Sequence, residues 1–190
     1  MLLHRCFPRD PSARPGTPGH WNFLQRPQRR GRWDNSDYYD SRYLAVTPVG
    51  AVAESFAGHS VWRDSTFLTP SGHPRALATF EIPDDTPLFD LDNAANLQSL
   101  GVKPSEVVRR NLPVAQSIGL KVYQQTRKDS PPAAGIKWWS SQLPAEDVVM
   151  LWSALGAPAP TDLIGMNNLT VNDENVAAAA DALRREIVIG

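Results

Sequence analysis

Short apolar runs, several of them alternating with polar residues, are spread along the chain and predict strands. The expected strands cover residues 2–7, 43–46, 76–82, 87–92, 135–140 and 147–152. The turn-rich stretch PDDT separates the third of these runs from the fourth. We therefore expect the strands at 76–82 and 87–92 to pair as a hairpin.

Other segments carry apolar residues at helical spacing. Thr47 followed by Pro48 is a typical N-cap and first-turn pair, and it predicts a helix over the AVAESF run that follows. An alanine-rich amphipathic helix is expected within residues 172–187, begun by Asn172 or Asp173 as cap. Further helices are expected at residues 94–101, 104–110 and 112–125.

These elements do not follow a regular strand–helix–strand order, and no sequence repeat recurs. We therefore predict an α+β fold, with a mixed or antiparallel sheet and flanking helices. A chain of 190 residues with 42% hydrophobic content is long enough for one core, so a single compact domain over residues 1–190 is expected. Residues 8–31 are rich in proline, glycine and arginine and predict a long connection.

Charge is distributed unevenly along the chain. The formal net charge is only -1, which gives no overall basic field for nucleic acid or an anionic membrane. Residues 1–32, however, contain seven arginines and one acid, Asp10. The RPQRRGR run within them has few neighbouring aromatic residues, so we expect no nucleic-acid partner. The basic segment is instead a plausible place for an anionic ligand.

Several common site types are absent from the sequence. Cys6 is the only cysteine, which excludes an internal disulfide and zinc-ribbon patterns. The four histidines show no metal-ligand spacing, so no metal is expected. Neither a GxGxxG nor a P-loop motif is present, and no apolar run is long enough for a membrane span. We expect a cytoplasmic protein that does not interact with membranes.

The segment GRWDNSDYYDSRYLAVTPVGAVAESF (31–56) strongly resembles the centre of RES-domain proteins. In it, eleven positions separate Arg32 from Tyr43, and eleven more separate Tyr43 from Glu54. HRCFPRD resembles the family's first strand, with its arginine at Arg5, and GIKWWSS resembles the strand that supplies the serine, at Ser140. The resemblance covers roughly residues 3–152, which leaves 153–190 as a C-terminal extension with a terminal helix. Two departures, Arg30 where many relatives have glycine and Ser36 where proline is common, affect loop positions.

The resemblance implies a fold like that of ADP-ribosyltransferases and a toxin of a bacterial toxin–antitoxin pair. Such toxins consume NAD by hydrolysis or phosphorolysis, or transfer ADP-ribose to a protein, and a cognate antitoxin is the expected partner. Cleavage of nicotinamide develops positive charge at the ribose C1′, which a carboxylate stabilises, and Glu54 is the candidate. Arg5 and Arg32 suit the pyrophosphate, since guanidinium groups bind phosphate oxygens in pairs. Tyr43 offers a ring for nicotinamide and a hydroxyl, and Ser140 is expected to hydrogen-bond the ribose or to orient Glu54.

Two other interpretations remain open at this point. The same pocket would serve a protein ADP-ribosyltransferase, and a non-catalytic module would instead bind nucleotides or a partner through residues 26–32. A cysteine nucleophile is disfavoured: His4 is the only histidine near Cys6, and we expect it on the opposite face of the strand. Cys6 is therefore expected to be a buried free thiol.

Overall fold

A sheet of seven strands, in the order β5-β6-β7-β2-β1-β4-β8, runs through the computed structural model, which describes residues 1–109 and 111–189. All neighbouring strands are antiparallel except β5 and β6, which are parallel. The strands are β1 (Leu2–Pro8), β2 (Asp40–Ala45), β4 (Arg75–Glu81), β5 (Leu88–Asp90), β6 (Gly135–Trp139), β7 (Asp147–Ser153) and β8 (Asp162–Asn168). Two short strands, β3 (Val61–Trp62) and β9 (Glu186–Ile187), form a separate parallel pair. The predicted α+β class with a mixed sheet is confirmed.

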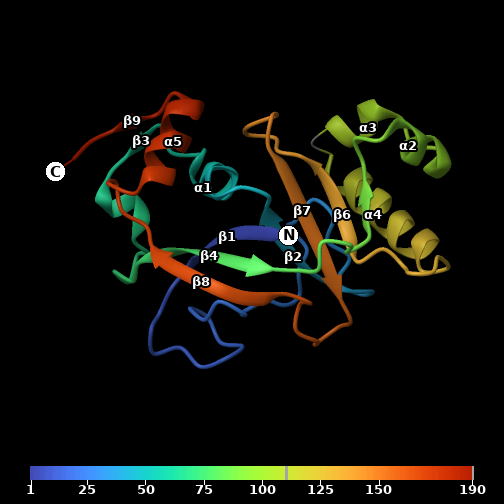
Figure 1. Cartoon of the computed structure of the whole chain (residues 1–190), viewed down its shortest axis with the longest axis horizontal. Helices are drawn as coiled ribbons and strands as arrows, with labels where there is room; N and C mark the ends of the chain where they lie inside the picture. Colours follow the sequence, from blue (N-terminus) through green and yellow to red (C-terminus); the bar gives the residue numbers. More distant parts are fainter. Residues whose placement is uncertain (110, 190) are drawn as a thin grey trace.

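The large sheet consists of two halves that are joined weakly. β2 pairs with β7 over six residues, and β1 pairs with β4 over seven. Between the halves, β1 and β2 pair only at His4 and Ala45. In Figure 1, β4 and β8 run across the direction of β6 and β7, so the two halves diverge in space.

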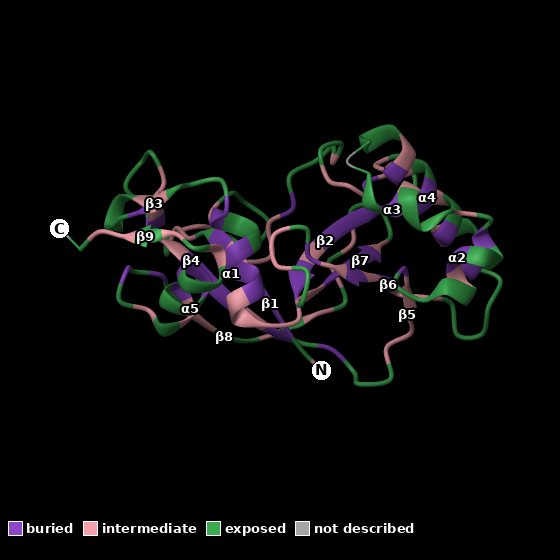
Figure 2. Ribbon diagram, turned by 90° about the horizontal axis from the view of Figure 1, so that it is seen from above, coloured by how far each residue is buried: buried purple, intermediate pink, exposed green. Residues whose placement is uncertain are grey.

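Helices cover one face of this sheet. α1 (Pro48–Phe56) and α5 (Glu174–Leu183) lie side by side over the β1-β4-β8 half, whereas α2 (Ala94–Leu100), α3 (Pro104–Val108) and α4 (Leu112–Thr126) lie beside the β5-β6-β7 half (Figures 1 and 2). The side-chain oxygens of Thr47, Asn111 and Asp173 cap α1, α4 and α5 by accepting backbone N–H groups that the first turn leaves unpaired. A 3-10 turn, η1 (Asp64–Phe67), follows β3.

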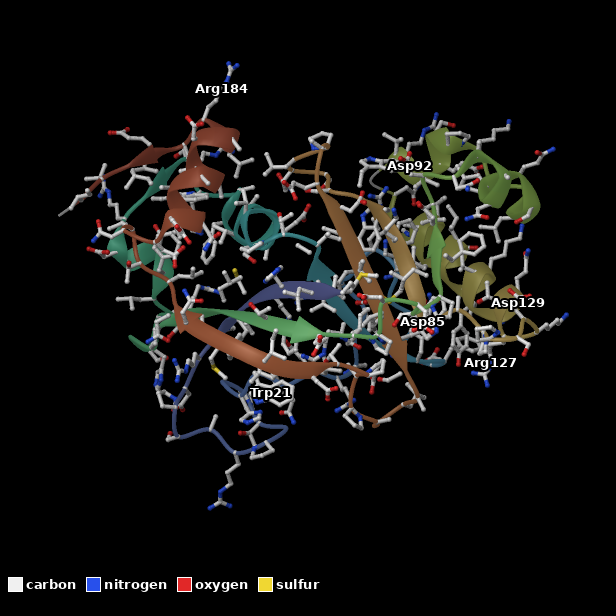
Figure 3. All side chains as sticks on the ribbon, viewed as in Figure 1. Trp21, Asp85, Asp92, Arg127, Asp129 and Arg184 are labelled. Carbon is white, nitrogen blue, oxygen red and sulfur yellow. The ribbon has the colours of Figure 1, made fainter. Side chains whose placement is uncertain are left out.

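The opposite face of the sheet has its own core beneath the long connection between β1 and β2. Leu3, Phe7 and Phe80 are buried there, and Trp21 of the connection packs against them, with its ring centroid 5.9 Å from that of Phe80. Figure 3 shows Trp21 on the side of the sheet away from α1 and α5. The predicted long connection therefore has a structural role as the cover of this second core.

Most predicted strands and helices are present, including the terminal helix within residues 172–187 with Asp173 as its N-cap, but two expectations were wrong or incomplete. β4 and β5 do not form a hairpin, because β1 and β8 occupy both sides of β4 and β5 pairs with β6. The terminal helix ends at Leu183, where Arg184 adopts a left-handed conformation, and β9 follows. α3 ends at Val108, and residue 110, the end of the helix expected at 104–110, lies outside the described residues. β8 was not predicted, because its half-exposed residues show no buried alternation.

Candidate functional site

A cavity of about 370 Å³ opens where β1 and β2 separate. Past the single pair formed by His4 and Ala45, the two strands no longer exchange hydrogen bonds. The residues that come next in this register line the cavity instead: Arg5, Cys6, Tyr43 and Leu44. Glu54 and Ser55 of α1 and Trp138 of β6 form further parts of the wall. The gap between the two half-sheets thus creates the cavity.

Glu54 lies in the second half of α1 and is held by Ser140, which directly follows β6. The Ser140 Oγ donates a hydrogen bond to Oε1 of Glu54 and accepts one from the backbone N–H of Gln142 and one from that of Leu143, both at 3.0 Å. A hydroxyl has one proton and two lone pairs, so all three positions are used. Because Ser140 is fully buried, its proton is fixed in the direction of the Glu54 carboxylate.

A second hydroxyl–carboxylate hydrogen bond joins α1 to the loop after β6, this time with the donor at the start of α1 and the acceptor in the loop. Thr47, the N-cap of α1, donates from Oγ1 to Oε2 of Glu146 at 2.5 Å and accepts from the N–H of Gly50 at 2.9 Å. Glu146 ends the loop that begins at Ser140, and its carbonyl accepts a hydrogen bond from the Ser140 N–H at 2.6 Å. We call the two bonds, Ser140–Glu54 and Thr47–Glu146, the α1 clamp.

Arg32 is held in a tight turn over residues 31–34. The carboxylate of Asp34 accepts the N–H of Gly31 at 2.6 Å on one oxygen and the hydroxyl of Tyr43 at 2.9 Å on the other. The same hydroxyl accepts the N–H of Trp33 at 2.8 Å. A Cβ at Gly31 would collide with the Asp34 carboxylate and the Tyr43 hydroxyl, so this position requires glycine.

This network defines what Tyr43 contributes. Burial, and then the charge of Asp34, raise the pKa of Tyr43 well above its ordinary value, so the hydroxyl stays protonated. Its proton and one lone pair are engaged in the turn, whereas its ring lines the cavity and meets the edge of Trp138 at a centroid distance of 6.1 Å. The hydroxyl that we expected to contact the ligand thus holds the turn that carries Arg32.

Arg5 lies half-buried in β1, near the fully buried Arg42 of β2. Burial lowers the pKa of Arg5, and burial followed by the charge of Arg5 lowers the pKa of Arg42 to about 10. The Arg42 guanidinium donates to the carbonyl oxygens of Trp21 at 3.1 Å and Asn22 at 3.2 Å. Neither arginine forms an ion pair within the described part of the chain. Two neighbouring cations, one buried and one half-buried, favour an anion at the Arg5 side of the cavity.

His4 and Cys6 both line this cavity, so the expectation that they face opposite sides of the strand was wrong. Residues two positions apart on a strand share a face. Burial lowers the pKa of His4, and its Nδ1 lies 3.2 Å from the Oγ1 of Thr79. Cys6 is a free thiol as expected, but the residue is half-buried and not fully buried. Burial raises the pKa of the thiol to about 12, which keeps it protonated and a poor nucleophile.

A second cavity, of about 470 Å³, adjoins the first. Arg32 and Ser141 line both cavities, and Ser140 lines the second. The remaining wall of this cavity comes from the loops and helix ends around α3 and α4 and from the end of β6: Arg30, Val108, Arg109, Asn111, Leu112, Ala115, Trp139 and Pro144. Both volumes lie in the range of small-molecule sites, roughly 300–1,000 Å³.

The structure therefore brings together all five residues proposed from the sequence. Arg5, Arg32, Tyr43 and Glu54 line the first cavity, and Ser140 contacts Glu54. The sequence reasoning missed Asp34, Glu146 and the positioning role of Thr47, although Thr47 was identified as a helix cap. Asp34 directly follows the GRW motif, and this position was the one signal available for it.

Over residues 1–109 and 111–189, no group of three or more His, Cys, Asp or Glu side chains is placed to hold a metal ion. Within the same ranges, none of the helices has both the length and the apolar character needed to cross a bilayer.

Comparisons with known proteins agree with the resemblance seen in the sequence. The family model of the RES domain matches residues 3–171, beyond residue 152 where we expected the resemblance to end. A crystal structure of the M. tuberculosis MbcT-MbcA toxin-antitoxin complex is similar in fold, with a TM-score of 0.60 and 14% sequence identity. The likeness covers 96% of this chain and 88% of that chain. No curated protein matches the sequence.

Proposed function

The chain belongs to the RES-domain family, and on this premise we propose that the Glu54 cavity binds NAD and cleaves its nicotinamide–ribose bond. The acceptor would be water or phosphate. The observation that supports this proposal most directly is the Ser140–Glu54 bond, which fixes a carboxylate at the wall of a cavity that two arginines also line. A carboxylate in this position stabilises positive charge that appears only as the bond breaks.

In the reaction, the bond between C1′ and the nicotinamide nitrogen breaks, and its electron pair neutralises the pyridinium ring. The leaving group therefore needs no proton. Glu54 stabilises the oxocarbenium-like ribose while water or phosphate attacks C1′. With water the products are nicotinamide, ADP-ribose and a proton, and with phosphate they are nicotinamide and ADP-ribose 1-phosphate.

The arginines serve to bind the substrate. Arg32 lies at the junction of the two cavities and Arg5 lies in the wall of the first, so their guanidinium groups suit the pyrophosphate that joins the two halves of a dinucleotide. The Tyr43 ring offers an apolar wall for the nicotinamide, while the Tyr43 hydroxyl keeps the Arg32 turn in place. Ser140 orients Glu54 and acts as a positioning residue.

We further propose that the protein is a toxin that depletes cellular NAD and that a cognate antitoxin neutralises it. The similar structure is described as a toxin-antitoxin complex. The arginine-rich residues 1–32 would attract an acidic antitoxin segment to the mouth of the cavity. Expression of the chain alone, with growth and cellular NAD measured, tests this role. Normal growth and unchanged NAD with soluble, folded protein would refute it.

The activity itself is tested by incubating the purified chain with NAD labelled in the ADP-ribose portion. The reaction is run with and without phosphate and with and without cell lysate, and the labelled product is identified. ADP-ribose indicates hydrolysis, ADP-ribose 1-phosphate indicates phosphorolysis, and label on a lysate protein indicates ADP-ribosyl transfer in the same cavity. Recovery of intact NAD in every reaction would contradict the proposal and favour a binding module.

A further inference from the structure

The second cavity is lined by three arginines, Arg30, Arg32 and Arg109, and by no acidic side chain among the described residues. Arg30 and Arg109 are exposed, and neither forms an ion pair within residues 1–109 and 111–189. The chain as a whole has more acidic than basic residues, and two of these three arginines, Arg30 and Arg32, come from the arginine-rich residues 1–32. Such a wall attracts anions.

The position of the cavity relates it to the Glu54 site. Arg32 and Ser141 belong to both cavities, so a ligand can extend from one into the other. Ser140 lines the second cavity while its hydroxyl holds Glu54 in the first. An anion bound by Arg30 and Arg109 would therefore lie next to a dinucleotide whose reacting bond is at Glu54.

We propose that Arg30 and Arg109, which both line the second cavity, form a phosphate-binding subsite there, separate from the pyrophosphate contacts of Arg5 and Arg32. The proposal rests on the function proposed above for the Glu54 cavity. Guanidinium groups bind phosphate oxygens in pairs through charge-assisted hydrogen bonds, and a doubly charged phosphate gains more from two such groups than a carboxylate does. The 15-residue helix α4 begins at Leu112 in the same wall and adds the positive end of its dipole.

The apolar part of the wall indicates that the phosphate is not the whole ligand there. Val108 and Leu112 are exposed at 59% and 38%, and Trp139 lies beside them in the lining. An apolar surface next to arginines suits a group with a flat ring and a phosphate, such as a phosphorylated adenosine. It also leaves room for a free phosphate ion close to Ser140. The shared chemistry is a phosphate group, either attached to the adenosine ribose of the dinucleotide or supplied as the free ion that attacks C1′.

Binding measurements on the full chain distinguish these sources without depending on turnover. The variants are Arg30→Gln, Arg109→Gln and the double variant. Arg29→Gln is the matched control for each single variant, and Arg14→Gln/Arg29→Gln is the matched control for the double variant. Arg14 and Arg29 are exposed and do not line the cavity, and their replacement removes the same charge. The probes are 5′-AMP, adenosine 2′,5′-bisphosphate and inorganic phosphate, titrated by calorimetry at constant ionic strength.

If the phosphate is attached to the ribose, the bisphosphate binds about 10-fold more tightly than 5′-AMP, as one or two charge-assisted hydrogen bonds would give. The double variant loses this preference and Arg14→Gln/Arg29→Gln keeps it. If the phosphate is free, the two nucleotides bind alike, and inorganic phosphate binds about 10-fold more weakly to the double variant than to Arg14→Gln/Arg29→Gln. Either pattern supports the subsite.

The subsite is overturned if all three probes bind the double variant as they bind Arg14→Gln/Arg29→Gln, because charge alone would then account for any change. The proposed function has a separate readout. If the wild-type chain leaves NAD intact but shows one of the two binding patterns, the cleavage reaction is wrong and the phosphate subsite stands. If NAD is cleaved and the probes bind the double variant and its control alike, the cleavage reaction stands and the phosphate subsite is wrong.

Discussion

Replacing Ser140 by alanine removes one hydroxyl that makes three hydrogen bonds. It leaves the backbone N–H groups of Gln142 and Leu143 without their acceptor, and it leaves Glu54 without its donor. The side chain is fully buried, so water does not simply replace it. The substitution therefore tests the stability of the loop and the position of Glu54 together.

The expected loss of stability follows from the two backbone groups. Each of these two hydrogen bonds contributes about 0.5–1.5 kcal/mol net, so the free energy of unfolding should fall by about 1–3 kcal/mol. For a chain of 190 residues this corresponds to a fall in Tm of roughly 2–12 °C, at about 2–4 °C per kcal/mol. The Glu54 carboxylate loses its fixed orientation, and misplacement of a catalytic group lowers kcat by about 10- to 100-fold.

Thermal unfolding by circular dichroism and turnover of labelled NAD measure the two effects separately. Ser65→Ala is the control, since Ser65 is exposed in η1 and its hydroxyl makes no hydrogen bond among the described residues. A double-mutant cycle with Glu54→Gln isolates the coupling between the two side chains. Unchanged Tm and unchanged kcat for Ser140→Ala would refute the reasoning, because the hydroxyl would then fix neither the loop nor the carboxylate.

The other predictions concern four further residues. Glu54→Gln keeps an oxygen that accepts the serine hydroxyl, so Tm should stay within a few degrees while NAD turnover falls by about 10²- to 10³-fold; near-normal turnover would reject Glu54 as the catalytic carboxylate. Tyr43→Phe leaves the Asp34 carboxylate short of a donor and should cost about 1–3 kcal/mol of unfolding free energy in a denaturant titration, with a raised KM for NAD; unchanged stability would mean that the hydroxyl does not hold the turn. Arg32→Lys keeps the charge but not the planar fork, so kcat/KM should fall at least about 10-fold in the same turnover assay, and an equal value would contradict paired phosphate contacts. The pKa of the Cys6 thiol is about 12 in the folded state, whereas its ordinary value is 9.0, so the unfolded chain loses this proton first. The free energy of unfolding should therefore fall as pH rises from 9 to 12. A flat profile for the wild type relative to Cys6→Ala would show that the thiol is not buried.

The sequence was sufficient for the parts of the fold and site that depend on local pattern or on family spacing. Thr47 and Pro48 defined the start of α1, and the helical periodicity defined α4. The resemblance predicted Arg5, Arg32, Tyr43, Glu54 and Ser140 at one site, and in the structure these residues line two adjoining cavities; their roles stay predictions.

The parts that could not be predicted depend on contacts between distant segments. Nothing in the residues of β4 shows that β1 and β8 take both of its edges, so the nearest strand in the sequence was the natural but wrong partner. The sequence also gives no indication that the Tyr43 hydroxyl is engaged by Asp34, or that Glu146 reaches Thr47 across 99 positions. A polar side chain in a motif can bind a ligand or hold its neighbours, and only its three-dimensional surroundings decide between the two.

Through the α1 clamp, the position of the Glu54 carboxylate depends on segments outside the cavity wall that carries it. Glu54 is carried by a helix that packs on β1 and β4, whereas Ser140 and Glu146 belong to the connection between β6 and β7. The two half-sheets share only one residue pair, so a small change in the angle between them meets little resistance from the sheet itself and acts directly on these two hydrogen bonds. A molecule that changed this angle from the outer surface of either half would thus act on the proposed reaction without entering the cavity. Inhibition of this kind would lower kcat and leave KM unchanged, which separates it from inhibition by a molecule that occupies the place of NAD.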